Sequence, residues 1–368
     1  MDISALLAQM STEHASDVFL SHGAPPAIVV AGVPRFIGDK ALTPIDTHEI
    51  AYSIMSDRQQ KEFEATLEMS LGIAPAGLGR FRVSIYRQRG EVAIAIRYIP
   101  TEIPSIETLR LPDTLQRLIM LPRGLILVVG ATGSGKSTTL ASMIDYRNQN
   151  TSGHILTVED PIEYLHRHKK SVVNQREVGL DTHGFHEALK NAMREAPDVI
   201  MIGEIRDSET MEAAISFSET GHLCLATLHS NNADQTIERI LNFFPEAAHR
   251  NILMNLALNL KAVVSQRLVV GKDGRRLPAV EVLINTPFIR DLLRRGQVHE
   301  VKEAMDRSLE EGMQTFDQSL FTLYKTGIIE LEEALNKADS RDGLALKIRL
   351  AEGGDSTTAH DAYDTATF

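Results

Sequence analysis

The segment Gly130–Ser137 contains the residues whose types and spacing indicate chemistry most directly. It reads Gly-Ala-Thr-Gly-Ser-Gly-Lys-Ser, the phosphate-loop pattern, and it lies between an apolar run and a helical pattern. Glycines let the backbone curl so that N–H groups point at phosphate oxygens, and the following helix adds a partial positive charge. We expect Lys136 to reach the β- and γ-phosphates of ATP and the Ser137 hydroxyl to bind Mg²⁺. The predicted nucleotide-binding residues are Gly130, Ala131, Thr132, Gly133, Ser134, Gly135, Lys136, Ser137 and Thr138.

Two acidic segments follow apolar runs further along the chain. Glu204 comes after the run Val199–Ile202, where a phosphate-loop ATPase holds its attacking water, so we predict a general base or water-orienting group. A cap for the next helix is the alternative. The segment from Glu159 to Glu163 places three acids in five residues, and a nearby Mg²⁺ would offset their negative potential. A solvated turn formed by Pro161 is the alternative there.

Two histidines flank the apolar run Leu223–Leu228. Seven residues apart on an extended strand, His222 and His229 face opposite sides, so we do not expect them to share one metal ion. His229 lies at the carboxyl end of the run, the edge where such sheets hold their active sites. His222 lies at the other end of the run, where we expect it to face a neighbouring subunit or to be structural. A purely structural role is the alternative for either histidine.

A set of arginines crowds onto one predicted hairpin: Arg80, Arg82, Arg87, Arg89 and Arg97. A forked guanidinium suits phosphate, and an arginine delivered from another domain or subunit can stabilise the charge on a leaving γ-phosphate. Arg80 and Arg82 share one face of their strand, so a charged strand face is the alternative interpretation.

The elements that must position these residues predict an α/β fold. The pattern of the first ~100 residues predicts a small α/β module. We expect strands at 17–20 and 27–30, helical spacing over 47–71, and a hairpin of strands 80–87 and 92–99. Apolar strands then alternate with helices, the strands at 125–129, 155–158, 199–202 and 223–228 and the helices at 137–146, 185–194 and 209–218. This alternation implies a mainly parallel sheet covered on both faces, with its site at the carboxyl ends of the strands. After residue 270 the pattern is mostly helical, with one strand at 279–284.

The composition excludes several classes of protein. The chain has 368 residues, long enough for two domains, and a net charge of −11, which disfavours nucleic acid as a partner. The single cysteine, Cys224, excludes an internal disulfide and a multi-cysteine zinc site, and it indicates a reducing compartment. We find no secretory signal and no apolar run of about 18 residues. We therefore expect a cytoplasmic protein without direct membrane insertion.

These motifs, in this order, resemble the type II/IV secretion ATPase superfamily and, within it, the PilT/PilU family of type IV pilus retraction ATPases. The resemblance runs from about Ala15 to about Ala334. Besides the phosphate loop, its landmarks are Ala15–Ser21, Arg80–Val83, Val158–Tyr164, Asn174–Gly179, Gly203–Asp207, Thr220–Leu223 and Ala226–His229.

The resemblance implies a PAS-like N-terminal α/β domain followed by a RecA-like phosphate-loop ATPase domain with a helical C-terminal part. We place these domains at 1–104 and 105–351, and the composition of 352–368 predicts a disordered acidic tail. The resemblance also implies a homo-hexameric ring in which the nucleotide sits between the two domains.

Site residues follow from the same resemblance, position by position. Glu163 falls in the family's aspartate box, and Glu204 falls at the catalytic glutamate of its atypical Walker B segment. His222 and His229 match the histidine box. Arg82 and Arg97 fall where the family sends arginines toward the γ-phosphate.

Two departures refine the expected role. Pilus-extension ATPases usually carry a four-cysteine zinc module, which a chain with one cysteine lacks. The segment Phe288–Leu293 stands in place of the retraction motor's Ala-Ile-Arg-Asn-Leu-Ile-type motif and, with the acidic tail, points to the PilU branch. The expected function is an ATP-hydrolysing motor that drives or assists pilus retraction in twitching motility. A RecA-like nucleic-acid motor, or an accessory subunit that supports a sister motor, is the alternative.

The family also suggests partners and a location. A sister retraction ATPase and the inner-membrane platform protein of the pilus machine are the expected partners. We therefore expect the protein to lie peripherally at the inner membrane, attached through the pilus machine.

Overall fold

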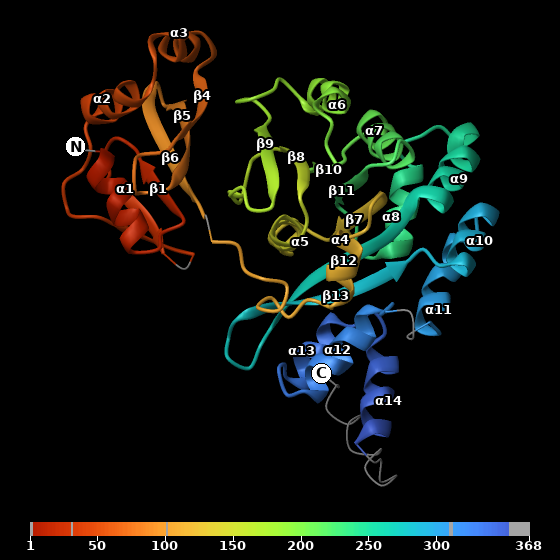
Figure 1. The fold of residues 1–368 in the computed structure, drawn as a ribbon. Helices are drawn as coiled ribbons and strands as arrows, with labels where there is room; N and C mark the ends of the chain where they lie inside the picture. Colours follow the sequence, from red (N-terminus) through yellow and green to blue (C-terminus); the bar gives the residue numbers. More distant parts are fainter. Residues whose placement is uncertain (1–2, 31, 101, 309–311, 353–368) are drawn as a thin grey trace. The chain divides into compact units, whose positions relative to one another are not determined.

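A computed structural model describes residues 3–30, 32–100, 102–308 and 312–352 of the chain (Figure 1). The chain divides into two compact units, each assembled from two stretches of sequence. The first unit combines Met1–Pro104 with Arg147–Gly203, and the second combines Ser105–Tyr146 with the chain from Glu204 onward. The domain boundaries given above stay predictions, and the predicted tail lies outside the described residues except for Glu352.

The N-terminal part of the first unit contains a six-stranded antiparallel sheet in the order β3-β2-β1-β6-β5-β4. Its strands are β1 (Asp17–Leu20), β2 (Ala27–Val30), β3 (Val33–Phe36), β4 (Glu68–Ile73), β5 (Arg80–Gln88) and β6 (Glu91–Ile99). The accompanying helices are α1 (Ile3–Thr12), α2 (Pro44–Ile54) and α3 (Asp57–Thr66). Capping boxes at Thr43 and Ser56 begin α2 and α3, because each hydroxyl accepts a backbone N–H of the first helical turn.

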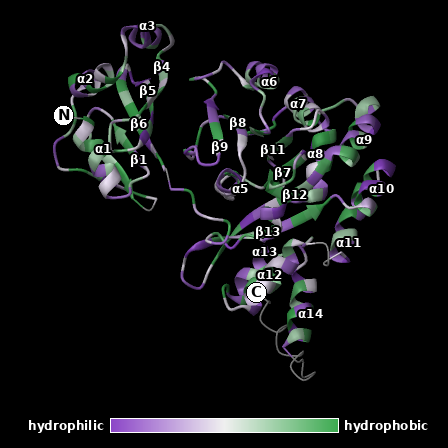
Figure 2. Cartoon of the chain, viewed as in Figure 1, coloured by the Kyte–Doolittle hydropathy of each residue, from purple (hydrophilic) through white to green (hydrophobic). Residues whose placement is uncertain are grey.

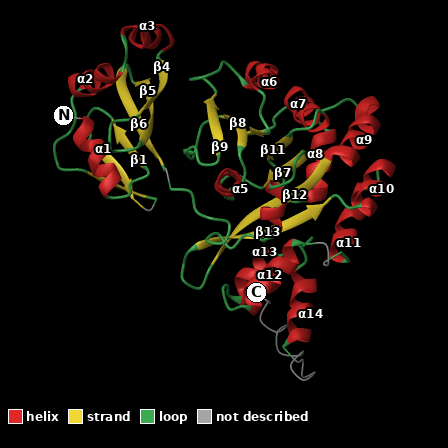
Figure 3. Cartoon of the chain, viewed as in Figure 1, coloured by secondary structure: helices red, strands yellow, loops and turns green. Residues whose placement is uncertain are grey.

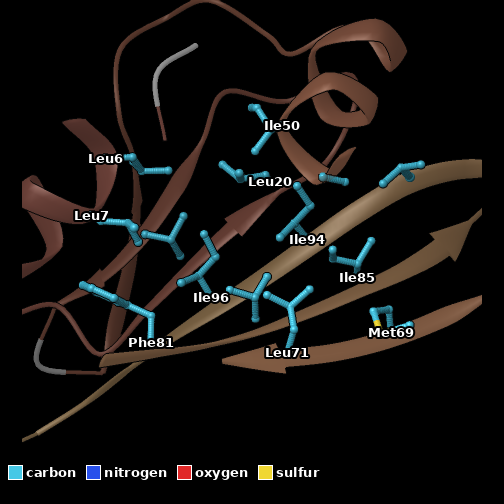
Figure 4. Close-up of a cluster of buried hydrophobic side chains, with 14 of the residues drawn as sticks. Leu6, Leu7, Leu20, Ile50, Met69, Leu71, Phe81, Ile85, Ile94 and Ile96 are labelled. Carbon is cyan, nitrogen blue, oxygen red and sulfur yellow. The ribbon is translucent and has the colours of Figure 1, made fainter. Parts of the chain in front are cut away.

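The core of this sheet lies between its inner face and the helices (Figure 4). Alternation along β5 places Phe81, Val83 and Ile85 inside, and they pack against residues such as Leu6 and Leu7 of α1 and Ile50 of α2. The strands predicted at 17–20 and 27–30 and the hairpin over 80–99 are confirmed.

The prediction of continuous helical spacing over 47–71 is wrong. The chain leaves the helix at Met55, begins again at Ser56, and ends α3 where Leu67 takes a left-handed conformation with φ of 65°. Met69 and Leu71 then alternate into the core as part of β4. Met69 and Leu71, spaced by two, have the period of a strand, but two residues are too few to show it after the helical spacing of Phe63 and Leu67.

The rest of the first unit is a parallel ladder in the order β10-β8-β9. It consists of β8 (Gly153–Glu159), β9 (Ser171–Glu177), β10 (Val199–Ile202) and the helix α6 (Phe185–Ala192). The sequence predicted β8, β10 and α6 but not β9, whose polar residues Asn174, Gln175 and Arg176 hide the strand pattern.

The second unit contains the strand order β13-β12-β7-β11, with β12, β7 and β11 parallel and β13 antiparallel (Figure 3). The strands are β7 (Gly124–Val129), β11 (Leu223–Leu228), β12 (Leu260–Val270) and β13 (Arg276–Ile284). The helices before residue 300 are α4 (Thr114–Ile119), α5 (Lys136–Asn150), α7 (Ser208–Glu219), α8 (Ala233–Leu241), α9 (His249–Asn259) and α10 (Pro287–Arg295). All residues of β7 and β11 are buried, and Figure 2 shows β7 as hydrophobic.

A helical C-terminal part completes the second unit. It contains α11 (Val301–Asp306), α12 (Phe316–Lys325), α13 (Leu331–Lys337) and α14 (Arg341–Ala351). Phe316 and Leu320 of α12 pack against Val269 and Ala279 of β12 and β13. The predicted α/β fold class with a helical C-terminal part is confirmed. Among the described residues, no helix combines the length and the apolar character that a membrane crossing requires.

Candidate active site

The predicted phosphate loop follows the carboxyl end of β7, and α5 begins at its lysine. Gly135 has a φ of 90°, and a Cβ added there would lie 2.7 Å from the side-chain nitrogen of Gln266. The Nζ of Lys136 donates hydrogen bonds to the carbonyls of Gly130 (2.9 Å) and Ala131 (3.0 Å). The lysine therefore lies folded over the loop, with its charge at the place where phosphates would enter.

The loop also holds an unused hydroxyl. The Oγ of Ser134 is buried and has no hydrogen-bond partner among the described residues. A Cβ at Gly130 would lie 2.5 Å from this oxygen, so only glycine leaves the space that Ser134 occupies. A buried hydroxyl without a hydrogen-bond partner destabilises the fold, unless a bound ligand supplies the missing partner. A phosphate oxygen could accept that hydrogen bond. The residues present therefore fit a nucleotide, and Ser137, in the first turn of α5, fits the Mg²⁺ that accompanies it.

Gln266 supports the loop, and the sequence analysis missed it. This residue of β12 is buried, and its Nε2 donates to the Ser134 carbonyl at 2.7 Å while its Oε1 accepts from the Thr139 hydroxyl at 2.7 Å. It thereby joins the loop to the first turn of α5. The available signal was a polar pair, Ser265 and Gln266, that directly follows the apolar residues Ala262–Val264 in a strand next to β7.

Glu204 follows β10 in sequence and lies in the second unit together with the loop. Its Oε1 is 3.1 Å from the Nε2 of His229, and its Oε2 accepts from the Nε of Arg206 at 2.8 Å. Both carboxylate oxygens thus have cationic or imidazole neighbours that hold the side chain in one orientation. The N–H of Ile205 donates to the carbonyl of Thr227, which ties this segment to β11 just before His229. The structure therefore brings the predicted acid and one predicted histidine together.

His222 lies at the other end of β11. Its Nδ1 is 3.1 Å from the Thr220 hydroxyl and 3.2 Å from the Phe217 carbonyl, and its ring contacts the edge of the Phe217 ring. These contacts are all local, and they close the turn between α7 and β11. The structure does not bring His222 to Glu204 or to His229.

The acidic segment after β8 lies in the first unit. Glu159 is buried, and burial raises the pKa of its carboxyl to about 7, although hydrogen bonds from Thr157 (2.7 Å) and Gln175 (3.0 Å) act against the shift. Glu163 is exposed. The two acids thus have different environments, with Glu159 held in the protein and Glu163 available at the surface.

Residues of β9 hold this acidic segment, and the sequence analysis gave them no individual role. Gln175 donates to Glu159 and also to the Tyr164 carbonyl at 2.8 Å. A carboxylate oxygen of Glu177 accepts from the N–H of Ile162 at 3.2 Å. The polar run Asn-Gln-Arg-Glu, which follows two valines, was the signal that could have found them.

The two predicted phosphate-binding arginines lie opposite each other. Arg82 of β5 and Arg97 of β6 are register partners on the face of the sheet away from its core. The Nε of Arg97 donates to Asp17 at 2.7 Å, and the Nε of Arg82 lies 3.8 Å from a carboxylate oxygen of Glu177. That Nε is buried and has no hydrogen-bond partner among the described residues. The structure therefore brings both arginines together within the first unit.

Comparison with known proteins gives a consistent result. The model of the family described as type II/IV secretion system protein matches residues 3–276. The type IV pilus ATPase PilU of Pseudomonas aeruginosa is 50% identical, over 97% of this chain and 94% of its own length. The type IV pilus retraction ATPase PilT of the same organism is 44% identical, over 92% of this chain and 98% of its own length.

Solved structures agree with these sequence matches. A crystal structure of the pilus retraction motor PilT with bound ADP has a TM-score of 0.88 at 45% identity, covering 94% of this chain and 99% of that chain. The ATPase DotB of Legionella pneumophila has a TM-score of 0.74 at 28% identity, covering 90% of this chain and 94% of that chain.

Proposed function

The chain belongs to the type II/IV secretion system protein family, and we propose that it is a motor of the type IV pilus machine that drives or assists pilus retraction in twitching motility. It is an ATPase and binds a nucleotide, as its similarity to the ADP-bound retraction motor indicates. The observation that carries the proposal is the loop at Gly130–Ser137, with Lys136 folded over it and a buried hydroxyl left for a phosphate oxygen.

Each site residue has a role in this proposal. Loop N–H groups and Lys136 bind the phosphates, and the Ser137 hydroxyl would hold Mg²⁺, which neutralises phosphate charge when bound. Glu204 orients the attacking water or accepts its proton, and His229 positions the Glu204 carboxylate. In the family pattern Glu163 falls at a functional acid of the aspartate box, and Arg82 and Arg97 stabilise charge on the γ-phosphate. We place His222 as a support of the turn that carries β11.

The assembly and location are part of the same proposal. We place an α/β domain at 1–104 and an ATPase domain at 105–351, and we propose that six copies form a ring. The proposed partners are a sister retraction ATPase and the inner-membrane platform protein of the pilus, which would hold a cytoplasmic ring at the membrane. The alternative of a nucleic-acid motor is not favoured, because the relatives that match over most of the chain are pilus ATPases.

The test compares the ATPase activity of the wild type with that of Lys136→Ala and Glu204→Gln. We expect both variants to lose a factor of about 100 or more in kcat, with Glu204→Gln still binding ATP because the loop is intact. Glu212→Gln, at an exposed carboxylate of α7, is the matched control and keeps wild-type turnover. Unchanged hydrolysis in Glu204→Gln would contradict the catalytic role.

Twitching motility then separates a motor from an accessory subunit. Each variant replaces the wild-type gene in cells with and without the sister ATPase. Loss of motility with the Lys136→Ala variant in both backgrounds supports a driving role. Normal motility with that variant when the sister motor is present favours the accessory role, and ATPase stimulation by single-stranded DNA would favour a nucleic-acid motor.

A further inference from the structure

Three positive charges meet at the amino edge of the second unit's sheet. Arg123 precedes β7, Lys261 lies near the start of β12, and Arg290 lies in α10. Lys261 occupies an irregularity in the register between β12 and β7, and a Cβ at Gly124 would lie 2.4 Å from its Cε. The lysine stem therefore lies over the Gly124 backbone. We call Arg123, Lys261 and Arg290 the amino-edge cluster, and it lies at the opposite end of β7 from the phosphate loop, about 20 Å away along the strand.

The cluster has no carboxylate partner among the described residues. None of its members forms an ion pair with the part of the chain that the structure describes, and within that part the buried Nε of Arg290 has no hydrogen-bond partner. The nearby acids are engaged elsewhere, because Asp291 pairs with Arg295 and Glu219 accepts from Asn259. Burial, together with the charges of Arg290 and Arg123, lowers the pKa of Lys261. Three like charges without an anion disfavour the folded state, which an incoming anion would reverse.

Exposed apolar side chains lie on the two helices beside the cluster. Met254 and Leu258 are one turn apart on α9 and are 39% and 50% exposed, and Phe288 in the first turn of α10 is 58% exposed. Asn285 donates to the carbonyls of Ala257 and Leu260, which holds the end of α9 beside the start of α10. Figure 1 shows the two helices as neighbours. The surface therefore combines unpaired cations with a few apolar contacts, in a chain whose net charge is −11.

We propose that the amino-edge cluster binds an acidic, partly apolar segment of a partner protein. A carboxylate enters between Lys261 and Arg290, both half-buried, where the ammonium and the terminal guanidinium nitrogens can donate to it. An adjacent apolar side chain of the partner packs on Leu258 or Phe288. A bilayer fits less well, because Met254, Leu258 and Phe288 are single side chains on two helices rather than one continuous apolar face.

The test measures binding by fluorescence anisotropy of a labelled peptide of repeated Glu-Glu-Leu triplets, with a Gln-Gln-Leu peptide as the uncharged comparison. The wild type binds the glutamate peptide more tightly, and it gains thermal stability from that peptide. The double variant Lys261→Gln and Arg290→Gln weakens this binding about tenfold or more, the size expected for a lost charge-assisted hydrogen bond. Arg349→Gln, at an exposed arginine of α14, loses the same type of charge and binds normally.

Turnover of ATP is measured on the same samples, so that a folding defect is separated from a binding defect. If the double variant does not fold, Lys261→Gln alone serves. Equal binding of the two peptides, or wild-type affinity in the folded variants, overturns the proposal. The proposal is also overturned if the glutamate peptide fails to bind and the protein instead sediments with anionic phosphatidylglycerol vesicles only when the cluster is intact. That result identifies a membrane site. Because peptide binding does not require hydrolysis, its outcome is independent of the proposed motor function.

Discussion

At the scale of single residues, the candidate site is organised by side chains that hold other side chains. Gln266 links the phosphate loop to α5, and His229 contacts the carboxylate of Glu204. Neither residue needs to touch the nucleotide to affect turnover, since the position of a loop carbonyl or of a carboxylate decides whether the chemistry is aligned.

Replacing Gln266 with methionine preserves the volume and removes both hydrogen bonds. The Ser134 carbonyl and the Thr139 hydroxyl then remain buried without a partner, so we expect the free energy of unfolding to fall by about 2 kcal/mol. We also expect weaker nucleotide binding, because the loop is no longer held in its curled form. Denaturant titration and nucleotide titration measure the two effects. Gln88→Met, at the end of β5, is the control. An affinity of Gln266→Met for ADP equal to that of the wild type would rule out a role for Gln266 in shaping the loop.

The two histidines provide a matched pair. In His229→Ala the Glu204 carboxylate loses a neighbour at 3.1 Å, so we expect kcat to fall while the affinity for ATP remains. In His222→Ala the turn before β11 loses its contacts with Thr220 and Phe217, so we expect a lower melting temperature and a smaller change in kcat. The opposite ranking in kcat would reverse our assignment of the two roles.

At the scale of elements, β12 and β13 connect the loop to the rest of the second unit. Next to Gln266, Arg267 lies 2.6 Å from Asp339 and its guanidinium lies 3.9 Å from the centre of the Phe316 ring, which attaches the C-terminal helices to β12. On β13, Glu281 accepts from the N–H of Ala233 at 2.9 Å and from the Ser265 hydroxyl at 3.1 Å. Gln266 and Arg267 are consecutive residues of β12 and point to opposite faces of the sheet. Gln266 therefore contacts the phosphate loop, and Arg267 contacts the C-terminal helices.

Glu281 makes stability depend on pH. Burial raises the pKa of its carboxyl to about 7, above the value of 4.5 for an unperturbed glutamate. Between these values the folded chain keeps the proton while the unfolded chain releases it, so stability falls as the pH rises toward 7. Glu281→Gln retains the acceptor oxygen for Ala233. We expect the variant to match the wild type near pH 4.5 and to be more stable by up to about 3 kcal/mol at pH 8.

Melting temperatures or denaturant midpoints recorded across this range check the prediction. Glu332→Gln, at an exposed carboxylate of α13, is the control and leaves the pH profile unchanged. A Glu281→Gln profile parallel to that of the wild type would show that Glu281 is ionised in the folded chain throughout.

At the scale of the whole molecule, the predicted site residues are distributed over both units. The loop, Glu204 and His229 lie in the second unit, whereas Glu163, Arg82 and Arg97 lie in the first. The proposed reaction therefore draws on residues of both units. If six copies form a ring, the ATPase activity of one copy depends on its neighbours, and this dependence can be measured.

We expect light scattering to give a mass six times that of the 40.7 kDa chain when ATP is present. In mixtures of the wild type with Glu204→Gln, we expect ATPase activity to fall faster than the wild-type fraction, because an inactive copy stalls its neighbours. Wild type mixed with an unrelated monomeric protein in the same buffer gives the reference, in which activity is proportional to the wild-type fraction. A single-chain mass with ATP, or activity proportional to the wild-type fraction, would contradict a coupled ring.

The chain by itself determined the parts that depend on short-range patterns. A phosphate loop is readable because glycine, lysine and serine must stand at fixed spacing, and β7, β10 and β11 are readable because they are continuous apolar runs. Their carboxyl ends then place Glu204 and His229 at one edge of a parallel sheet. The family resemblance added roles to these positions, and the comparisons confirm the family.

Only the tertiary structure decided which residues hold the site together. Gln266 is 132 residues from the Ser134 carbonyl that it binds, and Gln175 is 16 residues from Glu159, so no local pattern connects these partners. The amino-edge cluster has the same origin, because its residues come from three separate segments. Pairing between distant strands sets which side chains meet, and that pairing depends on contacts across the whole sheet rather than on neighbours in sequence.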